Sequence, residues 1–164
     1  MRGYRMAACG RRSLECVSGP SPTVEDAIAL AARVHRGQRY SSPEREPYVF
    51  HPLRVMLAFV DPVEQIAAVL HDAIEDTDLE INDLVEAGYP ADVVAAIDCL
   101  THRRDEAYER YIDRVAHNEV ARRVKVADLK ENLANNCRLP DGPGNAERIE
   151  RYQWSLERLG APSP

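Results

Sequence analysis

The chain has 164 residues, 45% of them hydrophobic, and a formal net charge of −6. This length is sufficient for a domain with a buried core. The negative charge argues against a general nucleic-acid binder, and no apolar run is long enough to span a bilayer, which argues against a membrane partner. The first 20 residues differ from the rest, because they carry four arginines against one glutamate and lack the apolar segment of a secretory signal. We therefore predict a disordered N-terminal extension over residues 1–20 and a single domain over residues 21–164.

The four cysteines also bear on the compartment. They are Cys9, Cys16, Cys99 and Cys137. No pair among them has the close spacing of a zinc knuckle or a redox motif. We interpret them as unpaired thiols in a reducing environment, so we expect a cytoplasmic protein.

The patterned part of the chain begins at Thr23, which is suited to cap a helix, with Asp26 at the capping-box position. Apolar residues at helical spacing follow, and Gly37 ends the pattern. Residues 38–48 form a polar loop that carries Arg39 and Tyr40. This loop is either a plain surface connection or a segment that offers a guanidinium and a ring to an anionic, planar ligand.

Further helices are predicted along the rest of the chain. His51 lies at a helix start, followed by Pro52 at a favoured first position, and Asp61 precedes another proline that restarts a helix. Helical spacing also predicts elements near residues 81–87, 93–101, 108–115, 119–136 and 145–159. No segment shows a strong period of two. The sequence therefore predicts an all-α fold, a compact bundle of about seven to eight helices.

Residues 69–77 combine an imidazole and three carboxylates directly behind an apolar run. If the helix that restarts at Asp61 continues through them, His71, Asp72, Glu75 and Asp76 fall on one arc roughly 140° wide. Carboxylates at a helix C-terminus face the negative end of its macrodipole, and a bound cation would offset that cost. The alternative is a solvated acidic helix end.

The helix predicted over residues 119–136 carries two apolar rows, so it should be substantially buried. A polar row crosses it, made of Lys125, Asp128, Asn132 and Asn135. Because lysine and aspartate are rarely buried without a partner, this row requires a ligand, a metal or internal pairing. An internal salt bridge with capping amides is the competing interpretation.

Four inward-facing polar residues come from three separate predicted helices: His51, His71, Asp72 and Asp128. Two imidazoles and two carboxylates without a thiolate suit a divalent ion that keeps open positions for water. Manganese or iron fits this donor set better than a closed structural zinc site. Glu75 and Asp76 would lie beyond the ligands, close enough to transfer protons without being ligands themselves.

Longer segments resemble a known family. His51, the His71-Asp72 pair and Asp128 match the HD-domain metal-dependent phosphohydrolases. Residues 47–52, 71–77 and 124–132 are similar to the hydrolase domain of the RelA/SpoT group, which includes small stand-alone alarmone hydrolases of the Mesh1 type. The resemblance covers about residues 23–159, with the order of the motifs kept.

This resemblance implies an HD-domain fold, a manganese site at the four residues named above, and Glu75 and Asp76 as catalytic acids. It implies removal of the 3′-pyrophosphate from guanosine tetra- or pentaphosphate, a small-molecule nucleotide. On the predicted helix over residues 119–136, it implies substrate contacts at Lys125, Asn132 and Asn135. The oligomeric state stays open.

One departure from the family concerns the loop after Gln38. The alarmone hydrolases typically carry an Arg-Lys pair there, and the matching positions are Tyr40 and Ser41, with Arg39 one residue early. We expect these three residues to contact the substrate, with the Tyr40 ring stacked on the base. Because Tyr40 brings no charge, an HD phosphohydrolase acting on another nucleotide or phosphoester is an alternative. A non-catalytic nucleotide-sensing HD domain is a third, and the intact set of ligands and acids argues against it.

Overall fold

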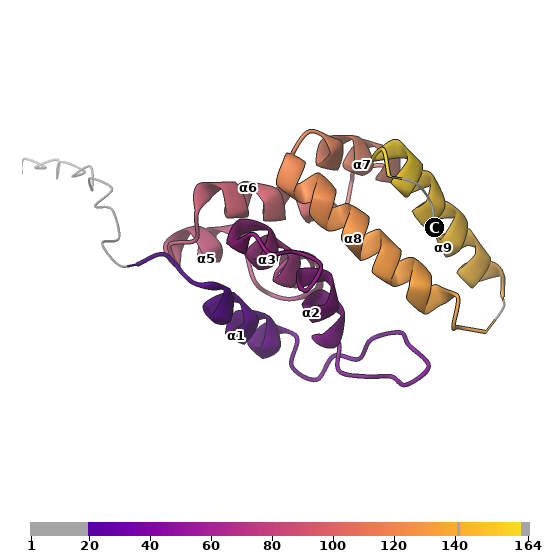
Figure 1. The fold of residues 1–164 in the computed structure, drawn as a ribbon, viewed down its shortest axis with the longest axis horizontal. Coiled ribbons are helices and arrows are strands. Elements are labelled where there is room, and N and C mark those ends of the chain that lie inside the picture. Colours follow the sequence, from indigo (N-terminus) through magenta and orange to yellow (C-terminus); the bar gives the residue numbers. More distant parts are fainter. Residues whose placement is uncertain (1–19, 141, 162–164) are drawn as a thin grey trace, which may run out of the picture.

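The computed structural model describes residues 20–140 and 142–161, so the predicted N-terminal extension lies almost wholly outside the described residues. Nine helices occur in these ranges, and no strand (Figure 1): α1 (Val24–Val34), α2 (Phe50–Met56), α3 (Pro62–Val69), α4 (Ala73–Asp76), α5 (Ile81–Glu86), α6 (Ala91–Leu100), α7 (Tyr108–Ala116), α8 (Glu119–Asn136) and α9 (Pro143–Arg158). The prediction of an all-α fold is confirmed. In the described ranges no helix is both long and apolar enough to cross a membrane.

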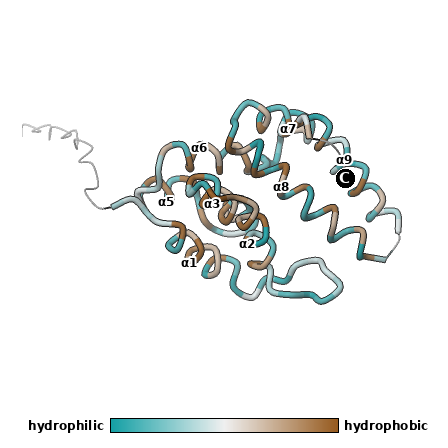
Figure 2. Tube along the Cα trace, viewed as in Figure 1, coloured by the Kyte–Doolittle hydropathy of each residue, from teal (hydrophilic) through white to brown (hydrophobic). Residues whose placement is uncertain are grey.

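The long helix α8 lies between two groups of helices. It packs against α2, α3 and α6 on one side, and against α7 and α9 on the other (Figure 1). Helix α3 in turn packs against α1, α2, α6 and α8. Figure 2 shows apolar residues concentrated in α3 and in stretches of its neighbours. Residues 67–70, at the end of α3, are completely buried, so the chain reaches His71 from the centre of the core.

Side-chain caps explain where several helices begin. The Thr23 hydroxyl accepts from the backbone N–H of Asp26, whose carboxylate accepts from the Thr23 N–H, so the predicted capping box is present. At α3, Asp61 accepts from two backbone N–H groups of the first turn, ahead of a proline at the first position. Asn118 caps α8 by accepting from the Ala121 N–H at 2.9 Å. These caps place the predicted starts of all three helices correctly.

The helix predicted to run from Asp61 through residue 77 is interrupted. Helix α3 ends at Val69 and α4 begins at Ala73, so His71 and Asp72 lie in the turn between them. The prediction that these two residues share one helical arc with Glu75 and Asp76 is therefore wrong. The His71 Nδ1 donates to the Ala68 carbonyl at 2.7 Å, which is the acceptor that a continuous helix would use for the Asp72 amide. This break accounts for the ninth helix.

Arg114 of α7 fixes the segment that joins α6 to α7. Its guanidinium donates to the carbonyl oxygens of Asp98, Cys99 and Thr101 at 2.9–3.0 Å, and these belong to the C-terminal end of α6. It also forms a two-bond pair with the carboxylate of Glu106, at 2.9 and 2.6 Å. The C-terminal carbonyls of a helix have no partner within it, so this arginine satisfies three of them at once.

We predict that the Glu106 pair contributes an acid-sensitive part of the stability. Hydrogen bonding to Arg114 lowers the pKa of Glu106 from 4.5 to about 2. A lowered pKa in the folded state means that the pair stabilises the fold above about pH 4.5 and loses this effect as the pH falls through about 2. The free energy of unfolding in urea should thus fall less steeply over this window for Glu106→Gln than for the wild type. Glu109→Gln, on the exposed face of α7, should keep the wild-type slope. Equal slopes for Glu106→Gln and the wild type would contradict the prediction.

Candidate functional site

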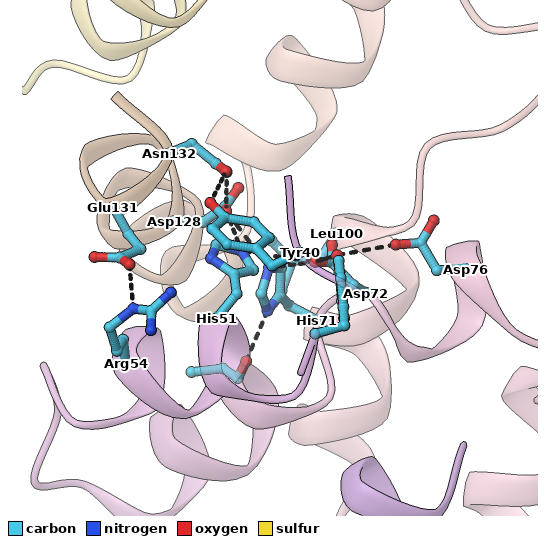
Figure 3. A network of polar contacts seen from close by, with 12 residues as sticks. Tyr40, His51, Arg54, His71, Asp72, Asp76, Leu100, Asp128, Glu131 and Asn132 are labelled. Carbon is cyan, nitrogen blue, oxygen red and sulfur yellow. Dashed lines mark hydrogen bonds and ion pairs between the residues drawn. The ribbon is translucent and has the colours of Figure 1, made fainter. Parts of the chain in front are cut away.

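The structure brings the four predicted metal ligands together. His51 comes from the first turn of α2, His71 and Asp72 from the turn between α3 and α4, and Asp128 from the middle of α8 (Figure 3). One ligand atom each of His51, His71 and Asp72 lies within 4.8 Å of the others. Asp128 Oδ1 lies 3.1 Å from His51 Nε2 and 3.5 Å from His71 Nε2. Three of the four side chains are buried, and Asp72 is partly exposed.

The His71 ring is oriented so that one nitrogen faces the carboxylates. Because Nδ1 donates to the Ala68 carbonyl, Nε2 is the atom that lies 3.0 Å from Asp72 Oδ2 and 3.5 Å from Asp128 Oδ1. This buried nitrogen forms no hydrogen bond. Burial by itself lowers the pKa of His71, but Asp72 and Asp128 raise it well above its usual value. A nitrogen placed between two carboxylates calls for a cation, either a proton on the ring or a metal ion, so the cluster could hold a divalent metal.

Both carboxylates of the cluster have pKa values below their usual range, and for Asp72 the neighbouring His71 is the main cause of this lowering. Burial raises the pKa of Asp128, but Lys125 and the two imidazoles lower it well below its usual value. Lys125 Nζ donates to Asp128 Oδ2 at 2.8 Å and Asn132 Nδ2 donates to Oδ1 at 2.5 Å. The polar row of α8 therefore includes the internal salt bridge that was the competing interpretation. The same row still presents Asp128 Oδ1 to both imidazoles.

Glu75 and Asp76 occupy different surroundings. Glu75 accepts from the backbone N–H of His102 at 3.0 Å and lines a cavity with the metal-ligand cluster. Asp76 lines a separate groove, and it shares the Tyr48 hydroxyl with Asp72, at 3.0 and 2.6 Å respectively. Burial raises the pKa of both carboxyls, and Asp72 adds to this effect.

Tyr40 lies against the cluster and does not line the cavity, and its ring is buried. The ring stacks on His51 with centroids 4.8 Å apart and planes 11° apart, and its hydroxyl donates to Asn132 Oδ1 at 2.7 Å (Figure 3). The guanidinium of Arg54 lies over the ring, 5.7 Å from its centroid. Tyr40 thus contacts one predicted ligand and the amide that holds another. Stacking on a substrate base stays a prediction, and it would require the ring to leave this position.

The other predicted substrate contacts divide into two groups. Lys125 and Asn132 line the cavity. Arg39 and Ser41 are exposed and do not line it, and the side chain of Asn135 donates to the Ser41 carbonyl at 2.8 Å, which fastens the loop to α8. The loop is therefore more than a plain surface connection, although in this structure it brings only Tyr48 to the cavity.

The cavity has a volume of about 470 Å³ and includes residues that sequence analysis did not select. These are Tyr48, His102, Tyr108, Tyr111, Arg151 and Tyr152. Tyr108, Tyr111 and Tyr152 belong to the apolar rows that predict the helices near residues 108–115 and 145–159, because a tyrosine counts as apolar in such a pattern. Their polar hydroxyl groups were the available signal, since a buried tyrosine usually places its oxygen at a polar boundary. His102 and Arg151 carried no periodic signal.

We predict that the Tyr40 ring supports the fold as well as the cluster. Tyr40→Phe keeps the stack on His51 and loses the hydrogen bond to Asn132, so the free energy of unfolding should fall by about 0.5–1.5 kcal/mol. Tyr40→Ala removes the buried ring and should cost about 3–5 kcal/mol, by analogy with other large aromatic truncations. Urea unfolding followed by circular dichroism measures both. A Tyr40→Ala protein as stable as the wild type would show that the ring is not buried in solution.

Comparisons with known proteins agree with this geometry. No family model matches the chain. It is 32% identical over 146 residues to the guanosine-3′,5′-bis(diphosphate) 3′-pyrophosphohydrolase MESH1 of Danio rerio, which covers 80% of this chain and 79% of that protein. It is also 32% identical over 145 residues to MESH1 of Homo sapiens, with 80% of each chain covered. A solved structure described as a metazoan ortholog of SpoT that hydrolyzes ppGpp superposes with a TM-score of 0.69 at 28% identity, covering 87% of this chain and 86% of that one. The chain therefore belongs to the MESH1 family of HD-domain phosphohydrolases.

Proposed function

We propose that this protein is a metal-dependent hydrolase that removes the 3′-pyrophosphate from guanosine 3′,5′-bis(diphosphate). The observation that carries the proposal is the convergence of two imidazoles and two carboxylates beside a cavity that Glu75 also lines. Relatives that align over 80% of the chain are named for this reaction. A non-catalytic sensor would not need both the ligand cluster and an adjacent acid with a raised pKa.

The reaction requires a water molecule and a proton. Water attacks the phosphorus attached to the 3′ oxygen of the ribose, and the bond between that phosphorus and the 3′ oxygen breaks. Pyrophosphate leaves with the oxygen of the water, and guanosine 5′-diphosphate remains after its 3′ oxygen receives a proton. The protein must therefore orient the attack, accept a proton from water and supply one to the leaving oxygen.

His51, His71, Asp72 and Asp128 would hold the divalent ion, and we favour manganese, with iron as the next choice, because this donor set contains no thiolate. When bound, such an ion lowers the pKa of a coordinated water and neutralises charge on a phosphoryl group. Neighbouring groups fix the orientation of the ligands. The Ala68 carbonyl fixes His71, and Lys125 and Asn132 fix Asp128. Such supporting hydrogen bonds set the ring tautomer and the position of each ligand.

Glu75 transfers the proton in this proposal. It lines the cavity, and burial raises its pKa, which makes the carboxyl easier to protonate at the site of proton transfer. The His102 N–H holds one of its oxygens in place. Asp76 acts indirectly, because it shares the Tyr48 hydroxyl with Asp72 and so helps to orient a ligand. Lys125 and Asn132 are the two predicted substrate contacts that face the cavity.

A second candidate function is hydrolysis of another nucleotide or phosphoester. It is favoured by one observation, which is that Arg39, the arginine nearest to the family's Arg-Lys pair, is exposed and does not line the cavity. Turnover of guanosine tetraphosphate, compared with turnover of its adenosine counterpart and of nucleotides that carry a single phosphoester, separates the two functions. The second function predicts a faster reaction with one of the analogues.

The first prediction from this proposal concerns the metal. The wild-type protein should bind about one divalent ion per chain, because the cluster presents one complete set of donors. Asp128→Ala should lose the ion, since it removes the carboxylate that faces both imidazoles, while its circular dichroism spectrum remains helical. Asp113→Ala removes a carboxylate on α7 that pairs with Arg158 and does not line the cavity, so this variant should retain the ion. Calorimetric titration with manganese measures all three. Full occupancy in Asp128→Ala would remove Asp128 from the site.

The second prediction concerns turnover. With manganese present, the wild-type protein should release pyrophosphate and guanosine 5′-diphosphate from guanosine tetraphosphate. Glu75→Gln keeps the shape of the side chain and should reduce the rate by about 10²–10⁴-fold, the usual contribution of a positioned acid or base. Manganese should still bind to this variant, and Glu109→Gln should react at the wild-type rate. Near-normal turnover by Glu75→Gln would eliminate the mechanism, and loss of manganese from it would make Glu75 a ligand.

A further inference from the structure

Two cationic side chains line the cavity, and they differ in their partners. Lys125 is already paired, because its Nζ donates to Asp128 Oδ2 at 2.8 Å. Arg151, on the exposed side of α9, has no carboxylate partner among residues 20–140 and 142–161. The positive charge of Arg151 is therefore available to a ligand, whereas that of Lys125 compensates the cluster.

Two aromatic rings hold the guanidinium of Arg151 at the cavity. It lies 5.0 Å from the centroid of Tyr108 on α7 and 5.8 Å from that of Tyr152 on α9, and both tyrosines also line the cavity. An arginine that stacks on an aromatic face keeps the N–H groups at its edge free for hydrogen bonds. Stacking also restricts the side chain before a ligand arrives, which reduces the entropy that binding must overcome.

A bis-diphosphate substrate needs a cation away from the metal cluster. The residues that line the cavity include three carboxylates, those of Asp72, Glu75 and Asp128, which repel a second anionic group. The loop of residues 38–48 does not supply the missing charge, because Arg39 is exposed and does not line the cavity. Arg151 supplies this positive charge from α9, which packs against α8.

We propose that Arg151 binds the diphosphate that is not cleaved, the one on the 5′ oxygen, and so selects nucleotides that carry a second anionic group. This inference rests on the proposed function, since it takes the cleaved 3′-pyrophosphate to lie at the metal cluster. The planar guanidinium matches two phosphate oxygens at once, which is why arginine is common at such sites. Tyr108 and Tyr152 act as positioning residues for the guanidinium.

The test compares Arg151→Gln with Arg158→Gln, which removes the same charge from the same helix at a residue paired with Asp113 and not lining the cavity. The first measurement is the binding of guanosine 5′-diphosphate and of guanosine to each protein by calorimetry, which requires no turnover. Arg151→Gln should weaken the binding of guanosine 5′-diphosphate by about 10- to 100-fold, the usual effect of losing hydrogen bonds to a charged group. Its binding of guanosine should stay within about twofold of the wild type, and Arg158→Gln should match the wild type with both ligands.

The second measurement is hydrolysis of guanosine tetraphosphate. Arg151→Gln should raise KM by a similar factor and leave kcat nearly unchanged, because the 5′-diphosphate does not change during the reaction. Equal binding of guanosine 5′-diphosphate by the two variants, or an equal loss for guanosine, would overturn the assignment of Arg151. A wild-type protein that binds guanosine 5′-diphosphate no better than guanosine would overturn it as well. Failure of the wild type to hydrolyse guanosine tetraphosphate would overturn the proposed function, while the binding measurement would still decide the role of Arg151.

Discussion

The structure depends on burying charged and polar groups where the apolar core ends. The last three residues of α3 and its C-cap Leu70 are completely buried, and the next residue is His71, whose ring is buried against two carboxylates. An isolated charge in such a place would cost several kcal/mol. Here each charged group has a partner, since Lys125 and Asn132 hold Asp128 and the Ala68 carbonyl holds one side of His71. The bundle is thus organised around a cluster of two carboxylates, of which Lys125 compensates one, and the remaining charge calls for a proton or a metal ion.

The buried charges of this cluster connect the fold to the proposed chemistry. The side chains that make the cluster costly in a dry core are those that a divalent ion prefers as ligands. The four ligand side chains come from α2, α8 and the turn after α3, so the relative positions of these elements set the geometry of the site. The acid at Glu75 depends on a different segment, because the backbone N–H that it accepts from belongs to His102, in the connection that Arg114 fixes. Distant parts of the chain therefore contribute to one cavity.

Much of the fold and of the candidate site could be predicted from the sequence at positions where neighbouring residues determine the local structure. Caps at Thr23 and Asp61 located helix starts, and the polar row on α8 correctly indicated an inward-facing Asp128. The break before Ala73 could not be predicted, because helical periodicity says nothing about a histidine ring that competes for a backbone carbonyl. Three of the four tyrosines that line the cavity were counted as apolar residues of a helix face, so the pattern did not mark them as site residues. The position of Tyr40 could not be derived either, since alignment of a loop by its length does not show which way a ring points.

The stacking of Tyr40 on His51 has a consequence for how recognition can diverge within this family. An arginine at this position would place a guanidinium against a buried imidazole and would leave Asn132 without the hydroxyl that it now accepts from. Exchange of this single residue would therefore disturb the cluster before it improved any contact with a nucleotide. A substitution at position 40 therefore acts on the ligand cluster as well as on any contact with the nucleotide. Arg151, in the middle of α9, stacks on two tyrosines and not on a metal ligand, so a change at that position leaves the ligand cluster intact.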